Sequence, residues 1–211
     1  MTVFPTTGRP RVIALSGGVG GAKLALGLSR ILPPSDLTIV VNTGDDFEHL
    51  GLAISPDLDT LLYTLAGLDN PATGWGRRDE SWSFMAALEQ FGGATWFRLG
   101  DKDLATHVER TRRLRAGETL TQVIASFGQQ FGIGPRLLPM SDDPVMTQVE
   151  TAAGWLDFQE YFVRRACRPE IRGIRFCGAE TARPQPEFLA ALRDPRLRAV
   201  IICPSNPFIS I

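Results

Sequence analysis

The first forty residues combine two short apolar runs with one segment of helical spacing. The apolar runs cover residues 12–15 and 37–41, and the second run is rich in β-branched side chains. Short continuous apolar runs are typical of strands that are buried on both faces. Between them, apolar residues recur every three or four positions from 24 to 32, and Pro33 ends the pattern. We therefore predict a strand–helix–strand unit with a right-handed crossover.

The segment 55–67 carries its own helix signals. Ser55 is a suitable N-cap, Pro56 fits the first helical position, and Asp57 lies where the helix dipole favours a negative charge. Four leucines then form one apolar face, and Gly67 is a suitable end. Similar patterns predict further helices at 80–93, 104–117, 119–132 and 184–194, and strands at 94–100 and 199–203.

Between residues 136 and 177 the pattern changes to short segments with strand character, such as "MTQVET" and "IRGIRFCG". We interpret this part as a β-rich insertion at about 136–177. Elsewhere, the alternation of strands and helices is typical of an α/β protein. The sequence thus predicts one Rossmann-like α/β domain over 1–211, with a mainly parallel sheet, flanking helices and this insertion.

The composition argues against several classes of function. The formal net charge is −1, so the bulk charge gives no support for binding to nucleic acid or to a membrane surface. No apolar run reaches 18 residues, and the first residues do not resemble a signal peptide, so we expect a cytoplasmic protein. Three cysteines without a C-x-x-C pair, and only two histidines, disfavour a zinc site or a histidine-based mechanism.

A glycine cluster separates the first predicted strand from the helix that follows it. A dinucleotide fingerprint fails because Lys23 occupies the last glycine position, and a P-loop fails because Leu24 follows that lysine. A glycine loop at the start of a helix still exposes backbone N–H groups that suit a phosphate. Alone, the pattern fits a phosphate site or a tight turn about equally well. The residues concerned are Ser16, Gly17, Gly18, Gly20 and Gly21.

Two adjacent carboxylates follow the second predicted strand. Asp45 and Asp46 lie at its carboxyl end, which is the edge where open α/β sheets bind ligands. Oxygen ligands close to a phosphate suit Mg²⁺. The alternative is a solvated acidic turn, because aspartate and glycine favour turns.

Six segments in order resemble the 2-phospho-L-lactate transferase family, known as CofD and in some bacteria as FbiA. They are "ALSGGVGGAKL", "VVNTGDDFEHLGLAISPDLDTLLYTLAG", "GWGRRDESW", "WFRLGDKDLATH", "RLLPMSDDPV" and "PSNPFISI". The resemblance runs from residue 11 to the end of the chain. Its six ordered motifs are far more specific than the glycine pattern alone.

The resemblance implies a reaction in the biosynthesis of coenzyme F-420. The family moves a phospholactyl-type group, or its phosphoenolpyruvyl or phosphoglyceryl counterpart, from a GDP-linked donor to the deazaflavin Fo. GMP is released and Mg²⁺ is required, and the family suggests a homodimer. By resemblance, Asp59 and Arg98 contact Fo, and the glycine loop meets the donor diphosphate. We further assign Ser205 and Asn206 to the nucleotide, and Asp45 and Asp46 to Mg²⁺ as the catalytic pair.

Family members continue well past "SNPFISI", so we expect this chain to lack further sheet, helices and part of the nucleotide pocket. Three alternatives stay open. A related regulatory family binds nucleotide sugars, but its sequence after the second strand is closer to "ADDGGSSG" than to the "NTGDDFEHLG" of this chain. A NAD-binding oxidoreductase is disfavoured by the broken fingerprint. An inactive remnant of the transferase is the third.

Overall fold

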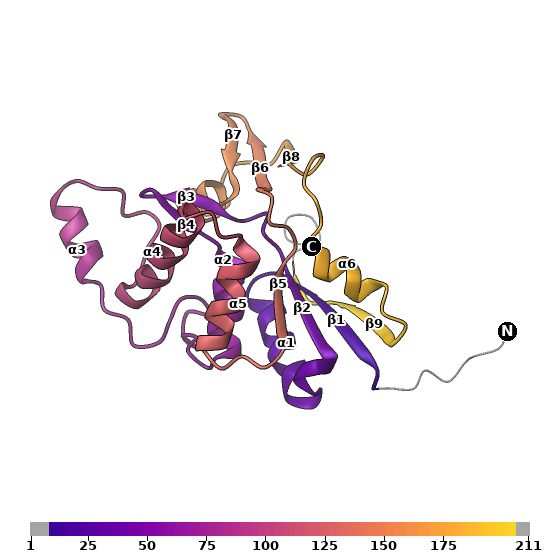
Figure 1. The fold of residues 1–211 in the computed structure, drawn as a ribbon. Coiled ribbons are helices and arrows are strands. Elements are labelled where there is room, and N and C mark those ends of the chain that lie inside the picture. Colours follow the sequence, from indigo (N-terminus) through magenta and orange to yellow (C-terminus); the bar gives the residue numbers. More distant parts are fainter. Residues whose placement is uncertain (1–8, 206–211) are drawn as a thin grey trace.

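A four-stranded parallel sheet forms the centre of the molecule (Figure 1). The computed structural model describes residues 9–205, so the predicted site residue Asn206 lies outside the described part of the chain. The strands lie in the order β5-β2-β1-β9, and all three pairings are parallel. The predicted α/β class with a parallel sheet is confirmed. The strands are β1 (Arg11–Ser16), β2 (Leu37–Val41), β5 (Arg136–Pro139) and β9 (Leu197–Ile202).

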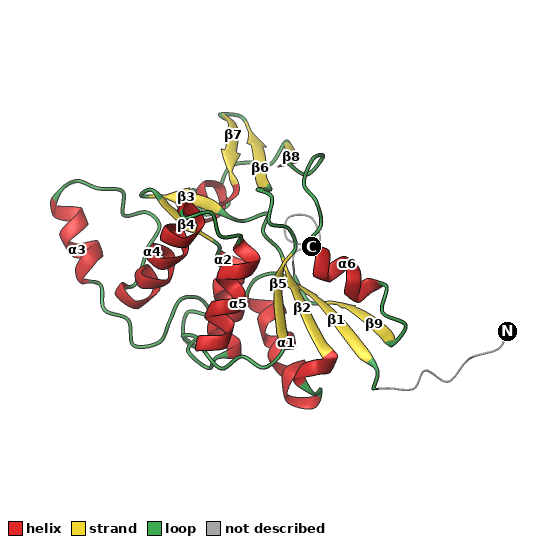
Figure 2. Ribbon diagram, in the orientation of Figure 1, coloured by secondary structure: helices red, strands yellow, loops and turns green. Residues whose placement is uncertain are grey.

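Helices cover the two faces of this sheet unequally (Figure 2). The helices α1 (Val19–Ile31), α2 (Pro56–Leu65) and α5 (Leu120–Gln130) each contribute buried apolar side chains to the main core with β1, β2 and β5. The predicted apolar face of α2 is part of this core, because Leu58, Leu61 and Leu62 are fully buried. A single shorter helix, α6 (Pro186–Leu192), lies on the other face and buries none of its residues.

The strand β9 differs from its expected surroundings. Its apolar sequence predicts burial on both faces, yet Val200 is 44% exposed and Ile202 is 68% exposed. Among the described residues, β9 pairs with β1 on one side only and forms the edge of the sheet, so this apolar strand is left partly uncovered. None of the described helices has both the length and the apolar character needed to cross a membrane.

A second layer of structure is formed by segments on both sides of α2 in the sequence. It contains the hairpin of β3 (Phe47–His49) and β4 (Leu52–Ile54), and the helices α3 (Ser83–Gln90) and α4 (Asp101–Arg115). The strand predicted at 94–100 is absent, since the segment has no neighbouring strand to pair with. Its Phe97 and Leu99 instead pack with Ile54 and Met85 in a small separate core. The helix predicted at 104–117 begins three residues earlier, at Asp101.

The starts of α3 and α4 cap each other. The carboxylate of Glu80, just before α3, accepts hydrogen bonds from the backbone N–H groups of Lys102 and Asp103 in the first turn of α4. Asp101 in turn accepts from the backbone N–H groups of Ser83 and Phe84. These bonds satisfy N–H groups that have no partner inside the helices. The two motifs "GRRDESW" and "FRLGDKD" are therefore held together.

We expect Glu80→Ala to lower the free energy of unfolding by about 1 kcal/mol, the usual cost of losing a helix cap. The substitution leaves two N–H groups at the start of α4 without their carboxylate partner. Urea denaturation measures the change. Glu89→Ala is the matched control, because Glu89 is exposed at the end of α3 and should change the stability by less than about 0.5 kcal/mol.

A three-stranded antiparallel sheet lies beyond the carboxyl edge of the main sheet. It consists of β6 (Met146–Thr151), β7 (Gly154–Asp157) and β8 (Gly173–Cys177), in the order β7-β6-β8. A single π-helical turn (Glu160–Arg164) lies between β7 and β8. The β-rich part therefore begins later than the predicted residue 136, because β5 pairs with β2 in the main sheet.

Candidate functional site at the carboxyl edge of the sheet

The carboxyl ends of the four parallel strands place four loops side by side. The chain leaves β1 into the glycine loop and leaves β2 into "NTGDD". Backbone hydrogen bonds continue across this edge, from Asn42 N–H to the carbonyl of Ser16 and from Cys203 N–H to the carbonyl of Leu15. The antiparallel sheet is attached to the same edge, because Thr147 N–H donates to the carbonyl of Gly44 over 2.7 Å.

The glycine loop packs tightly at the start of α1. Gly18 is the N-cap, and its carbonyl accepts the first hydrogen bond of the helix, from Ala22 N–H. A Cβ at Gly20 would lie 2.7 Å from the backbone oxygen of Pro204, and a Cβ at Gly21 would overlap the buried Oγ of Ser16. These glycines are thus required by close packing, which also brings the chain after β9 against the loop.

Gly20→Ala is expected to lower the free energy of unfolding by about 1–3 kcal/mol, because the new methyl group must displace backbone after β9. Gly27→Ala is the matched control on the same helix. Nothing lies within 4 Å of a Cβ at Gly27, so alanine should leave the stability unchanged or raise it by up to about 1 kcal/mol. Thermal and urea unfolding of both variants test the comparison; equal losses would contradict it.

Asp45 and Asp57 form a buried carboxylate pair beside this loop. The side-chain N–H₂ of Asn42 lies 3.2 Å from Asp45 Oδ1 and 3.0 Å from Asp57 Oδ2, so both carboxylates approach one amide group. Burial, followed by the charge of Asp57, raises the pKa of Asp45 to about 8. Burial raises the pKa of Asp57 to about 6, although Asn42 and the backbone N–H of Gly18 oppose the shift. The pair thus retains a proton near neutral pH.

Asp46, which neighbours Asp45 in sequence, points elsewhere. Its Oδ2 accepts a hydrogen bond of 2.7 Å from the Oγ of Ser55, while its Oδ1 is buried without a partner. Burial raises the pKa of Asp46 well above its ordinary value. Ser55 is the N-cap residue of α2, as predicted, but its hydroxyl bonds to Asp46 instead of capping the helix.

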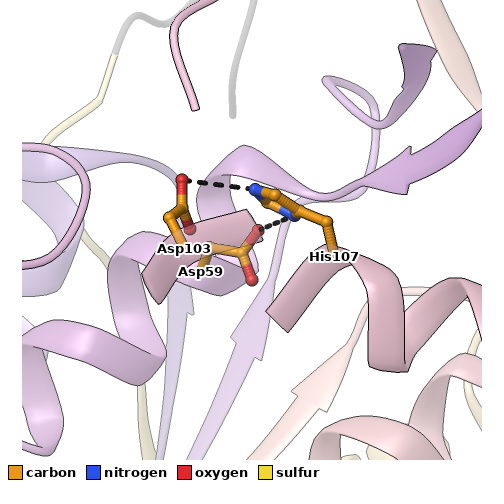
Figure 3. Close-up of side chains that lie close together, drawn as sticks. All are labelled: Asp59, Asp103 and His107. Atoms are coloured by element: carbon orange, nitrogen blue, oxygen red, sulfur yellow. Dashed lines mark ion pairs between the residues drawn. The ribbon is translucent and has the colours of Figure 1, made fainter. Parts of the chain in front are cut away.

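A second group of buried polar side chains joins α2 to α4 (Figure 3). His107 lies between two carboxylates, with its Nδ1 3.6 Å from Asp59 Oδ2 and its Nε2 3.2 Å from Asp103 Oδ2. Arg110 forms an ion pair with Asp59 through both terminal nitrogens. The hydroxyl of Tyr63 donates to Asp103 over 2.6 Å. Asp59, which resemblance assigns to the deazaflavin, therefore lies inside a paired network.

The other predicted site residues lie apart from this network. Arg98 is exposed, and its guanidinium lies 4.2 Å from the centre of the Trp82 ring. Ser205 is half-buried and directly follows Pro204, whose carbonyl contacts the glycine loop. A hollow of about 950 Å³ lies beside β5, between α5 and α6, and its lining contains none of the predicted site residues.

Sequence reasoning missed Asp57, Asn42 and the side chains that α4 contributes. Asp57 has an ordinary explanation as a charge at the start of a helix, and only the fold shows that it faces Asp45. The signal on α4 is present in the sequence, because Asp103, His107 and Arg110 are spaced by four and three residues. That spacing places them on one face of a helix, where they extend into the buried side.

Comparison with known proteins agrees with these motifs. The family model of the 2-phospho-L-lactate transferase CofD matches residues 12–211. A phosphoenolpyruvate transferase from Kitasatospora aureofaciens is 44% identical over 207 residues, which cover 95% of this chain and 64% of that protein. A 2-phospho-L-lactate transferase from Methanospirillum hungatei is 42% identical over 197 residues, with 93% and 66% covered. The chain thus spans slightly less than two thirds of the length of these relatives.

A solved structure supports the fold independently. A UPF0052 family protein from Bacillus halodurans superposes with a TM-score of 0.63 over 97% of this chain and 62% of that chain, at 16% identity. At that identity the likeness concerns the fold alone. The CofD family match, in contrast, extends through the glycine loop, the "NTGDD" loop, α2 and α4. By its sequence and by the residues gathered at this edge, the chain belongs to the 2-phospho-L-lactate transferase (CofD) family.

Proposed function

We propose that this chain carries a transferase site of coenzyme F-420 biosynthesis. In the proposed reaction, a phospholactyl, phosphoenolpyruvyl or phosphoglyceryl group moves from a GDP-linked donor to the deazaflavin Fo, and GMP is released. Support comes from the CofD family match and from relatives named phosphoenolpyruvate transferase and 2-phospho-L-lactate transferase. The activity is a proposal because the chain spans 64% of the first of those relatives.

The observation that carries the proposal is the Asp45–Asp57 pair. Two buried carboxylates face one amide group at the carboxyl edge of the sheet, and no described residue forms an ion pair with either of them. Carboxylate oxygens are the ligands that Mg²⁺ prefers, usually with water and substrate phosphate completing its shell. The residues present therefore fit Mg²⁺, and we assign Asp45 and Asp57 as its protein ligands. This assignment replaces Asp46, whose carboxylate bonds to Ser55.

The remaining residues would position the donor. A bound Mg²⁺ would neutralise the negative charge of the diphosphate. The donor diphosphate would lie at the start of α1, where the helix dipole and the backbone N–H groups of the first turn favour an anion. The terminal hydroxyl of Fo would attack the phosphorus distal to guanosine, so that a new P–O bond forms, the P–O bond to GMP breaks, and the hydroxyl proton is released to water. Such reactions depend mainly on positioning and charge neutralisation.

The acceptor subsite is assigned to the exposed surface near Trp82 and Arg98. An indole and a stacked guanidinium offer a flat surface of the kind on which a planar heteroaromatic ring binds. Asp59, in contrast, is paired with Arg110. We therefore propose that Arg98 contacts Fo directly and that Asp59 acts by holding α2 in position.

Incubation of the protein with Fo, Mg²⁺ and each of the three donors, followed by mass analysis, tests this function. We expect one donor to give the corresponding Fo adduct and an equal amount of GMP. Asp45→Asn serves as the control that separates the enzyme from a contaminant. Absence of product with every donor would contradict the proposal, and nucleotide-sugar binding in the same preparation would favour the regulatory alternative.

A further inference from the structure

Arg110 of α4 is a fully buried guanidinium in a strongly acidic part of the molecule. Its side chain is 0% exposed, and it is the largest fully buried side chain in the part of the chain that the structure describes. Four aspartates of the surrounding network and carboxylate pair are less than 10% exposed: Asp45, Asp57, Asp59 and Asp103. Burying a charge is costly unless an opposite charge accompanies it. The question is which carboxylates Arg110 neutralises.

The contacts of Arg110 answer this question. Both terminal nitrogens donate to Asp59, with Nη1 3.1 Å from Oδ2. The same Nη1 lies 3.2 Å from the carbonyl of Ala53 and 3.3 Å from His107 Nδ1. Burial alone would lower the pKa of Arg110, but the charge of Asp59 and its hydrogen bond raise it. Arg110 thus pairs with Asp59, and no hydrogen bond joins it to the Asp45–Asp57 pair among the described residues.

The cluster beside Arg110 has the geometry of a cation site. One ligand atom from each of Asp59, Asp103 and His107 lies within 4.8 Å of the others, and all three residues are buried. Two carboxylate oxygens and an imidazole nitrogen form a donor set that suits Mn²⁺ and similar ions. Because the guanidinium already occupies the carboxylate of Asp59, a cation entering this cluster would meet a positive charge directly beside it.

We propose that Arg110 takes the place of a cation in the Asp59–Asp103–His107 cluster and thereby confines the divalent cation to the Asp45–Asp57 pair. Arg110 is a positioning residue: it touches no reacting group, and it acts by occupying the carboxylate of Asp59 with its own positive charge. This inference rests on the proposed function for the identity of the first site. That Arg110 takes the place of a cation in the Asp59–Asp103–His107 cluster is inferred from the contacts of Arg110 alone.

Counting bound Mn²⁺ by electron paramagnetic resonance at pH 8 tests the inference. Arg110→Met keeps the length of the side chain and removes its charge. We expect this variant to bind one Mn²⁺ more than the unsubstituted protein. The double variant Arg110→Met with Asp103→Asn should lose the additional ion, because the cluster then lacks a ligand. An equal count and equal affinity in Arg110→Met and the unsubstituted protein would overturn the proposal.

A second variant covers the case in which Arg110→Met does not fold, which circular dichroism would show. Asp59→Asn retains the shape of the side chain and leaves Arg110 without its ion-pair partner. The freed positive charge should weaken Mn²⁺ binding at the Asp45–Asp57 pair by about tenfold. Unchanged affinity would contradict the proposal. Turnover is not part of either measurement, so a protein that binds Mn²⁺ as expected but forms no product would contradict the proposed function alone.

Discussion

Asp45→Asn is expected to lower transferase turnover by about a thousandfold, which corresponds to about 4 kcal/mol of transition-state stabilisation. The substitution keeps the shape of the side chain but replaces one of the two carboxylates that would hold the cation beside the glycine loop with a neutral amide. The cation would then bind weakly, and the charge that develops on the phosphate of the leaving GMP would lose its counter-charge. Turnover measured across a Mg²⁺ titration reports both the maximal rate and the cation requirement.

The adjacent Asp46→Asn variant provides the matched comparison. Because Asp46 bonds to the hydroxyl of Ser55 and lies outside the proposed pair, an amide of the same shape leaves both proposed cation ligands in place. We expect turnover within about threefold of the unsubstituted protein and the same Mg²⁺ dependence. A large loss of turnover in Asp46→Asn together with normal turnover in Asp45→Asn would show that Asp46, and not Asp45, holds the cation.

The second large effect concerns pH. Mg²⁺ can bind the Asp45–Asp57 pair only when both carboxyl groups have lost their protons. With a pKa of about 8 for Asp45 and about 6 for Asp57, cation affinity should rise steeply between pH 6 and pH 8 and level off above that range. The expected gain is about a hundredfold. Calorimetric Mg²⁺ titrations at several pH values measure it, and an affinity independent of pH over this range would refute the assignment.

Stability without a cation should show the opposite trend. In the folded protein Asp45 keeps its proton up to a pH of about 8, whereas in the unfolded chain it loses the proton near pH 3.8. The unfolded state therefore binds fewer protons between these values, and the free energy of unfolding falls as the pH rises through this window. Saturating Mg²⁺ should reduce that fall, because the cation replaces the proton in the folded protein.

Much of the fold follows from local pattern. The glycine loop between two apolar runs predicts β1, α1 and β2, and the leucine spacing after Ser55 predicts α2, because both depend on periodic burial. The segment 94–100 is different. Its apolar residues look like a strand, but whether they pair with a neighbour or fill a small core is decided by the rest of the chain.

The candidate site is only partly accessible to sequence reasoning. The place of the site follows from the topology, since parallel strands bring their carboxyl ends to one edge. Whether Asp46 or Asp57 is the second carboxylate of the site does not follow from the topology. Adjacent residues in a loop can point in opposite directions, and Asp57 comes from a separate helix. The pairing of Asp59 with Arg110 depends on how α2 packs beside α4, which no spacing within either helix specifies.

The central claim is that Asp45 and Asp57 together form the cation site of this edge, and Mn²⁺ binding to Asp57→Asn and Asp46→Asn at pH 8 tests it most directly. Electron paramagnetic resonance should show one Mn²⁺ bound by the unsubstituted protein and by Asp46→Asn with similar affinity. Binding to Asp57→Asn should be at least about tenfold weaker, because one of the two ligand charges is lost. Normal binding by Asp57→Asn together with a loss in Asp46→Asn would contradict the account.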